Sequence, residues 1–98
     1  MLKGVTPLDI ITQTITIKNK LGLHTRATIK LVELVNAFDA QITITHNGKQ
    51  ADAGSVLGLL VLETCLGQEI EIAAQGPQAQ EAMLAVTELI ENKFLEEE

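Results

Sequence analysis

Apolar and polar residues alternate with period two in several stretches of the chain, and each stretch predicts a strand. In residues 14–18 the alternation is strict and uses threonine and isoleucine, which is typical of a half-buried strand. It returns in residues 40–45 and in residues 68–74. The dipeptide Asn47-Gly48 follows the second stretch and predicts a tight hairpin turn, so residues 49–53 are expected to form a short returning strand.

Three other stretches have the pattern of helices. Apolar residues recur every three or four positions in residues 25–38, which predicts an amphipathic helix. Residues 56–62 are apolar nearly all round and follow Ser55, a suitable N-cap, so we interpret them as a short helix. Pro77 suits the first position of a last helix, where a missing N–H is no loss. The residues expected to face the core are Ala27, Leu31, Leu34, Val35 and Phe38 in the first helix and Ala82, Val86, Leu89 and Ile90 in the last, with Lys30, Glu33 and Asn36 on the outer side of the first.

The order of these elements, βαββαβα, indicates an α+β domain. Alternating strands need one covered face and tolerate one face in water, which a four-stranded antiparallel sheet with three helices on one face provides. Gly4 and Pro7 break any regular pattern, so residues 1–10 are expected to form an N-terminal arm. Residues 11–95 are then a single domain, and residues 96–98, all glutamate, a solvated acidic tail.

The charge balance limits the classes of partner. The 98 residues carry a formal net charge of −6, so the chain is a poor ligand for nucleic acid or for an anionic membrane surface, and we expect protein partners. No secretory signal is visible at the start, and the apolar run 56–62 is too short to span a bilayer. The cytoplasm is therefore the expected location, and a monomer the expected state.

No pattern of metal-ligating residues is found in the sequence. The single cysteine, Cys65, can form neither an internal disulfide nor a thiolate cage, and it is expected to be a small packing residue. The acidic residues lack the spacing of a metal-binding loop, and His46, beside the hairpin turn, is expected to be a surface residue. We therefore expect no metal and no cofactor.

The segment 22–28 carries the candidate chemistry. His24 lies where the predicted helix begins, and the first N–H groups of a helix lack internal partners and attract anions, phosphate above all. Arg26 adds a planar cation that opposes the helix dipole and therefore suits a site that an anion visits. A neutral imidazole nitrogen is nucleophilic near pH 7, and a phosphoryl group on it would face these donors. From these residues alone, a surface or capping histidine is the open alternative.

Two segments of the chain resemble one known family. The run Gly22-Leu23-His24-Thr25-Arg26-Ala27-Thr28 resembles the active-site motif Gly-Leu-His-Ala-Arg-Pro-Ala of the HPr family, the histidine phosphocarriers of the bacterial phosphotransferase system. The run Ser55-Val56-Leu57-Gly58-Leu59-Leu60 is similar to that family's Ser-Ile-Met-Gly-Val-Met, and the spacing between the two segments agrees. The resemblance covers residues 12–94 and implies the family's fold, an open-faced β-sandwich of order βαββαβα.

The resemblance also implies a function and assigns roles to residues. His24 would accept a phosphoryl group on Nδ1 from a phosphoenolpyruvate-dependent, Enzyme I-type kinase and pass it to a IIA-type acceptor protein. Arg26 would steady the phosphate, and the backbone N–H groups of Thr25 and Arg26 would complete the anion site. Such a carrier is a stoichiometric intermediate of phosphoryl transfer rather than a free-standing enzyme.

The sequence departs from the family motif and is similar to one branch of the family. Ala27 stands where the family has proline, and Thr28 where it has alanine, so the first turn is expected to be less preorganised and transfer slower rather than lost. Carriers of the sugar-transport branch tend to have basic residues on the exposed side of the first helix, where this chain has Ile29 and Glu33. Asn36 occupies a third such position. The runs Lys30-Leu31-Val32-Glu33-Leu34 and Phe38-Asp39-Ala40, and the ending of Phe94 followed by acids, are similar to the carriers of the nitrogen-related branch, in which a different charge pattern would reject the wrong partners.

The second segment adds candidate residues for regulation and docking. Ser55 matches the serine that a dedicated kinase phosphorylates in some family members, and an N-cap hydroxyl is the alternative explanation. Leu57 and Leu60 match positions that dock partners in the family. We expect Leu57 to be exposed, and Val56 and Leu59 to be partly buried.

Three alternative functions are considered beside this one. The first is a sugar-transport HPr, and the second is a regulatory binding module of the same fold that transfers no phosphate. Relatives of the second kind lack the histidine, so His24 argues against it. The third is a small hydrolase that uses His24, but the sequence offers no obvious acid partner for the ring and no adjacent serine or cysteine nucleophile.

Overall fold

A computed structural model describes residues 9–95 of the chain and confirms the predicted order of elements. The acidic tail predicted at residues 96–98 lies outside the described residues, as do residues 1–8 of the predicted arm, and Ile10 of that arm already belongs to the first strand. The elements are β1 (Ile10–Thr16), α1 (Thr25–Val35), β2 (Gln41–His46), β3 (Lys49–Asp52), α2 (Val56–Val61), β4 (Glu69–Gln75), α3 (Ala79–Glu91) and a terminal turn η1 (Lys93–Leu95).

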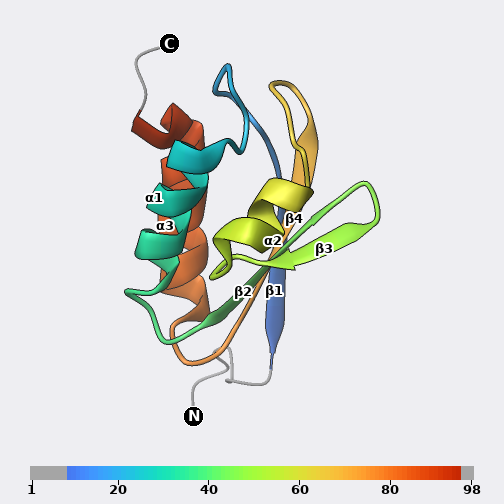
Figure 1. The fold of residues 1–98 in the computed structure, drawn as a ribbon. Helices are drawn as coiled ribbons and strands as arrows, with labels where there is room; N and C mark the ends of the chain where they lie inside the picture. The colour runs from blue at the N-terminus through green and yellow to red at the C-terminus, as the bar shows by residue number, and fades with distance from the viewer. Residues whose placement is uncertain (1–8, 96–98) are drawn as a thin grey trace.

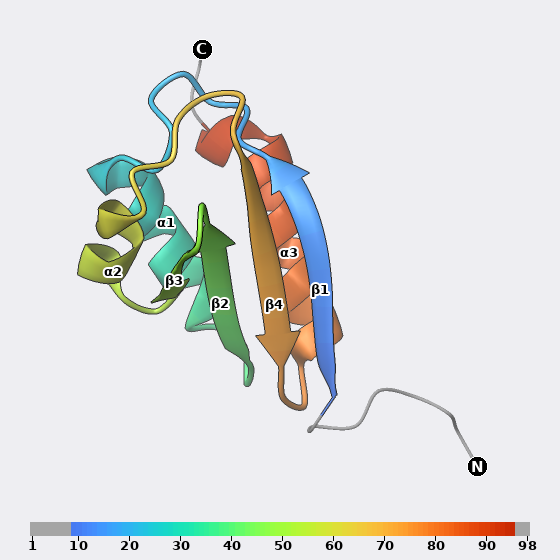
Figure 2. The same ribbon diagram turned by 90° about the vertical axis from the view of Figure 1, so that its right-hand side faces the viewer.

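The strands form one antiparallel sheet in the order β1-β4-β2-β3, and the helices cover one of its faces. In Figure 1 the three helices lie on the same side of the strands, and Figure 2 looks toward the opposite side, where no helix covers the sheet. α3 packs against β4, β1 and β2, whereas α2 packs against α1 and β3. The fold is thus the predicted open-faced, two-layer α+β arrangement.

Register places the buried isoleucines of the strands on the covered face. Ile15 of β1 lies opposite Ile70 of β4, and Ile44 of β2 lies opposite Ile72 of β4. The core between sheet and helices is almost entirely aliphatic, and the one aromatic side chain fully buried in it is Phe94. Its other fully enclosed members include Ile17, Ala27, Leu31, Ile42, Leu59, Ala74, Ala82, Val86 and Ile90.

The hairpin prediction is confirmed in detail. Asn47 and Gly48 both have positive φ, 55° and 82°, and the strands they join pair His46 with Lys49. Positive φ at both central residues is the geometry of the hairpin turn that Asn-Gly favours. The returning strand β3 has four residues, as short as expected.

Two predicted element boundaries are wrong. α1 ends at Val35 rather than at residue 38, because the N–H groups of Ala37 and Phe38 bond three residues back instead of four and tighten the chain into a turn. Pro77 is not the first residue of α3. Gln78 precedes that helix and exchanges two hydrogen bonds with Asp39, its N–H donating to the Asp39 carbonyl and its Oε1 accepting from the Asp39 N–H over 2.7 Å.

β1 also differs from the stretch that alternation predicts. It spans Ile10–Thr16 and pairs with β4 along its whole length, although residues 12–14 are exposed. Main-chain pairing with β4, not burial of side chains, therefore extends this strand beyond the strictly alternating residues.

The turn η1, which follows α3, covers one end of the core and is not predicted by the periodicity of the sequence. Lys93, Phe94 and Leu95 all have positive φ, between 56° and 64°, and this backbone turns the Phe94 side chain fully into the core. Lys30 of α1 donates a hydrogen bond from Nζ to the Phe94 carbonyl over 2.6 Å. The terminal turn is thus fastened to α1 by a core side chain and by a charged donor.

Phe94→Ala is expected to lower the free energy of unfolding by about 3–5 kcal/mol, because it removes a fully buried aromatic side chain and leaves a cavity. Urea denaturation measures this loss. Phe38→Ala is the matched control, since Phe38 is only half-buried and its loss should be clearly smaller. Equal losses in the two variants would contradict the role of Phe94 as the aromatic centre of the core.

Candidate functional site

His24 is the N-cap residue of α1. Its backbone is extended, with φ −83° and ψ 178°, and its carbonyl accepts the first hydrogen bond of the helix from the Thr28 N–H over 2.9 Å. Its side chain makes no capping bond to the first turn and is half-exposed. The imidazole therefore lies at the helix start, within reach of solvent, rather than in the core.

The first turn of α1 is an electropositive helix end. The N–H groups of Thr25, Arg26 and Ala27 precede the first intrahelical bond, so the helix itself offers them no acceptor. No acidic residue lies in this turn, and Arg26 adds an exposed guanidinium to it. N–H groups without an intrahelical acceptor, the helix dipole and a planar cation all favour an anion in front of the helix.

The loop before His24 is held by a close approach of two backbone segments. Gly22 has φ 64°, and a Cβ at this position would lie 2.2 Å from the carbonyl oxygen of Thr64. The Leu23 N–H donates to that same oxygen over 3.4 Å. Glycine is thus required here both for its backbone conformation and for the space that it leaves.

Two residues that depart from the family motif are buried in α1. Ala27 and Thr28 both have no exposed surface, and the Thr28 hydroxyl donates to the Thr25 carbonyl over 2.8 Å. Thr28 thus satisfies its polar group within the first turn. Helix α1 begins at Thr25 with alanine in the place of the family's proline.

Ser55 caps α2 as the sequence predicts. Its Oγ accepts a hydrogen bond from the Gly58 N–H over 3.0 Å, and the residue is half-buried. Asp52 supports the approach to the helix, since one of its carboxylate oxygens accepts from the Gly54 N–H over 2.7 Å.

Apolar side chains are exposed on the two helices that pack against each other, α1 and α2. On α1, Ile29 is 43% exposed and Glu33 is exposed. On α2, Leu57 is 77% exposed, as expected, and Leu60 is half-buried. Val56 is half-buried as expected, but Leu59 is fully rather than partly buried.

Val61 is a candidate docking residue that the sequence analysis did not single out. It is 61% exposed and lies four residues after Leu57, on the same side of α2. That spacing was the available signal, but a helix that is apolar nearly all round does not reveal which of its sides is covered. We call Ile29, Leu57, Leu60 and Val61 the apolar helix face.

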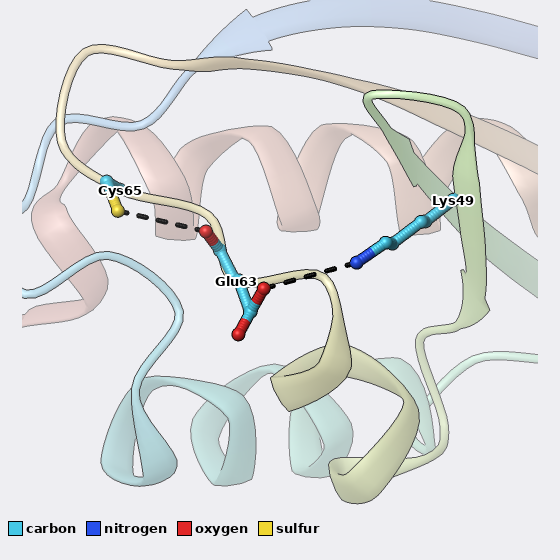
Figure 3. Close-up of polar contacts among 3 residues, drawn as sticks. All are labelled: Lys49, Glu63 and Cys65. Carbon is cyan, nitrogen blue, oxygen red and sulfur yellow. Dashed lines mark hydrogen bonds and ion pairs between the residues drawn. The ribbon is translucent and has the colours of Figure 1, made fainter.

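The expectation that Cys65 packs in the core is wrong, because its side chain is exposed. Its N–H donates to the side-chain Oε1 of Gln68 over 2.8 Å, and this bond holds the loop while the thiol stays outside. Figure 3 shows the thiol directed at the carbonyl of Glu63, 3.7 Å away, while the carboxylate of Glu63 lies 4.0 Å from Nζ of Lys49. Both ends of that ion pair are largely exposed, so it stabilises the fold little.

Two features are absent from the described part of the chain, residues 9–95. No group of three or more histidine, cysteine, aspartate or glutamate side chains there could hold a metal ion. No helix there has both the length and the apolar character needed to cross a membrane. His46 is half-buried, with Nδ1 lying 3.2 Å from the Glu69 carbonyl.

The fold is that of a small phosphocarrier protein. The crystal structure of HPr-C-His from Thermoanaerobacter tengcongensis matches it with a TM-score of 0.86 and 36% sequence identity, covering 90% of this chain and 99% of that one. A family model described as "PTS HPr component phosphorylation site" matches residues 11–92. The chain belongs to the HPr family of phosphocarriers.

Relatives named NPr and relatives named HPr are both similar to this chain. The phosphocarrier protein NPr of Shewanella violacea is 50% identical over 80 residues, which are 82% of this chain and 88% of that protein. The phosphocarrier protein HPr of Cupriavidus necator is 45% identical over 83 residues, which are 85% of this chain and 93% of that protein. The predicted family and fold are therefore confirmed, and the branch is a matter for proposal.

Gly22→Ala is expected to destabilise the domain more than Gly48→Ala. Both glycines have positive φ, so each substitution should cost about 1–2 kcal/mol for the left-handed backbone. At Gly48 nothing lies within 4 Å of the added Cβ, whereas at Gly22 it meets the Thr64 carbonyl, and such overpacking adds about 1–3 kcal/mol. Urea denaturation of the two variants measures the difference, and equal stabilities would show that the two backbone segments are not in contact in solution.

Proposed function

We propose that His24 is the residue that carries the phosphoryl group. The observation that supports this most strongly is the half-exposed imidazole at the N-cap of α1, in front of backbone N–H groups and beside Arg26. An imidazole there can receive a dianion without leaving the helix end that stabilises it. His24 would accept the group from a phosphoenolpyruvate-dependent, Enzyme I-type kinase and pass it to a IIA-type acceptor protein.

The transfer step follows from the chemistry of the ring. A deprotonated ring nitrogen, Nδ1 by the family resemblance, attacks the phosphorus of the kinase's phosphoryl donor. A P–N bond to His24 forms while the donor's bond to phosphorus breaks, and the electron pair of that bond leaves with the donor atom. The added negative charge is stabilised by the N–H groups of Thr25 and Arg26 and by the guanidinium of Arg26. The reverse exchange then delivers the group to the acceptor.

The charge pattern around His24 supports the nitrogen-related branch. α1 contains two cations, but Lys30 is half-buried and donates to the Phe94 carbonyl, so only Arg26 is exposed. The remaining outward positions that flank the site carry Ile29 and Glu33. A kinase or acceptor whose surface is built for basic residues on this helix would leave its acids unpaired against such a face.

The apolar helix face is proposed as the surface that docks the kinase and the acceptor. Leu57 and Val61 are largely exposed and Leu60 half-exposed on α2, and Ile29 is 43% exposed on α1, the helix against which α2 packs. Exposed aliphatic side chains grouped on packed helices are typical of a protein-binding surface. The same proposal places the chain in the cytoplasm and lets it act as a monomer.

Ser55 is proposed chiefly as the cap of α2, with regulatory phosphorylation as its second role. Its Oγ is already engaged by the Gly58 N–H, so a kinase would have to break this cap to reach the hydroxyl. Losing such a cap costs about 1 kcal/mol. A phosphate at the same place would add about two negative charges beside the docking surface.

Replacing His24 by alanine is expected to abolish phosphorylation of the protein by phosphoenolpyruvate and a nitrogen-branch Enzyme I. The wild-type protein should gain an acid-labile, base-stable phosphate, seen by mass spectrometry after acid and alkaline treatment.

Arg26→Ala should slow the transfer by about tenfold or more without unfolding the domain, because the site loses its fixed cation. The transfer rate of Arg26→Lys should lie between those of the wild type and Arg26→Ala, since lysine keeps the charge but lacks the planar guanidinium.

Each part of this proposal has its own contradicting result. Unchanged phosphorylation of His24→Ala would reject the carrier site. An unchanged rate in Arg26→Ala would reject only the role of the guanidinium. Faster transfer from a sugar-branch Enzyme I than from the nitrogen-branch one would reject the branch, and binding of a partner without any transfer would favour the regulatory module instead.

Leu57→Glu is expected to raise the KM of the kinase for this carrier by about tenfold, because it puts a charge in the apolar helix face. Leu84→Glu is the matched control, since Leu84 is also a strongly exposed leucine, 61%, but lies on α3. Neither variant should change the free energy of unfolding by more than about 0.5 kcal/mol. A KM that rises equally in both variants would show that the docking surface is not on α1 and α2.

A further inference from the structure

The loop that precedes His24 contains a buried polar side chain. Asn19 has no exposed surface, whereas Lys20 and Leu21, which follow it, are exposed. The amide of Asn19 donates a hydrogen bond from Nδ2 to the Gly22 carbonyl over 2.8 Å. A fully buried amide whose bond closes a loop restrains that loop strongly, because the group loses its hydration if the bond opens.

Asn19 and Gly22 are joined by two hydrogen bonds, not one. The Gly22 N–H donates to the Asn19 carbonyl over 3.2 Å, while the Asn19 side chain donates to the Gly22 carbonyl. Together the two bonds close a ring that fixes both peptide groups of Gly22. The loop between them can therefore not rotate about Gly22 without breaking one of the bonds.

The Gly22 carbonyl also connects this ring to the proposed phosphate carrier. It accepts a second hydrogen bond, from the His24 N–H, over 2.9 Å. From the other side, Thr64 packs its carbonyl against Gly22 and accepts from the Leu23 N–H. The residue before α1 is thus oriented by Asn19 on one side and by Thr64 on the other.

We propose that Asn19 is a positioning residue for phosphoryl transfer, which acts on His24 through the Gly22 carbonyl. This inference rests on the proposed function of His24, since it explains how the imidazole of His24 is kept at the start of α1. Asn19 is expected to affect the reaction of a bound partner and not the docking itself, because its side chain is buried and contributes nothing to the apolar helix face.

The experiment compares Asn19→Ala with wild type in the kinase reaction. We expect kcat to fall by about tenfold while KM changes by less than twofold, since a small displacement of a reacting group slows the chemical step. The ¹⁵N order parameter of the His24 amide should fall from a rigid value near 0.85 toward about 0.6. That second measurement needs no kinase and no phosphate.

Thr87→Val is the matched control for a general loss of stability. The Thr87 hydroxyl is buried in α3 and donates to the Leu84 carbonyl over 2.9 Å, so its removal also deletes a buried hydrogen bond, but in another element. It should leave kcat and the order parameter of His24 unchanged. Asn19→Asp, which keeps the shape of the side chain and loses the Nδ2 donor, should behave like Asn19→Ala.

The outcomes separate this inference from the function on which it rests. A loop that stays rigid in Asn19→Ala with an unchanged kcat, or a kcat that falls equally in Thr87→Val, would overturn the role of Asn19. A wild-type protein that takes no phosphate on His24 would overturn the proposed function, and the order parameter would still decide whether Asn19 holds the loop. Should both Asn19 variants fail to fold, exchange of the Asn19 side-chain amide protons in the wild type decides, and rapid exchange would overturn the inference.

Discussion

The close approach of Gly22 to the Thr64 carbonyl fixes where the first helix can begin. Gly22 has φ 64° and no side chain, so two backbone segments meet there at a distance that no other residue permits. α1 starts only a few residues later, at Thr25. The place where its first N–H groups emerge therefore follows from main-chain packing. A side chain at the N-cap needs only its own torsions to present a group to those donors.

The charged residues of α1 do not stabilise its helix dipole, and burial of its apolar side chains explains why the helix forms nonetheless. It has no acid in its first turn, a cation at Arg26 and no base in its last turn, whereas α3 has Glu81 in its first turn. Ala27 and Leu31, by contrast, have no exposed surface. Burial of such side chains contributes more than a helix dipole loses, about 1.5–3 kcal/mol for a fully buried leucine against about 0.3–1 kcal/mol. The helix can therefore form although its first turn contains no acidic side chain.

Local patterns predicted the features of the fold that depend on local chemistry. The Asn47-Gly48 turn, the capping by Ser55 and the start of α1 each follow from residues close together in sequence, and the structure confirms all three. For the candidate site, the sequence located the histidine and arginine at a helix start, which needs only the position of one helix boundary.

Features that depend on distant contacts were missed. α3 begins after Gln78 rather than at Pro77, because Gln78 is held by Asp39, a residue of a remote loop. Cys65 looks like a packing residue by type, but backbone bonds that join Gly67 and Gln68 to the distant Ile17 hold its loop, and the thiol is exposed. Asn19 looks like an ordinary turn residue, and only the three-dimensional structure shows that its amide is fully buried. No pattern within a short window contains this information.

Lys30 shows how such a distant contact changes the electrostatics of the site. Periodicity places it on the outer side of α1, where it would be a second cation for a partner, but its ammonium donates to the Phe94 carbonyl. Of the two cations of α1, only Arg26 is then exposed, so contact between apolar groups should contribute more to binding on this helix than charge does. On such a surface the proposed phosphoryl group would itself be the largest charge. If His24 carries this group as proposed, its arrival or departure would change the local charge by about two units, which would give a kinase and an acceptor a direct physical means to distinguish the empty carrier from the loaded one.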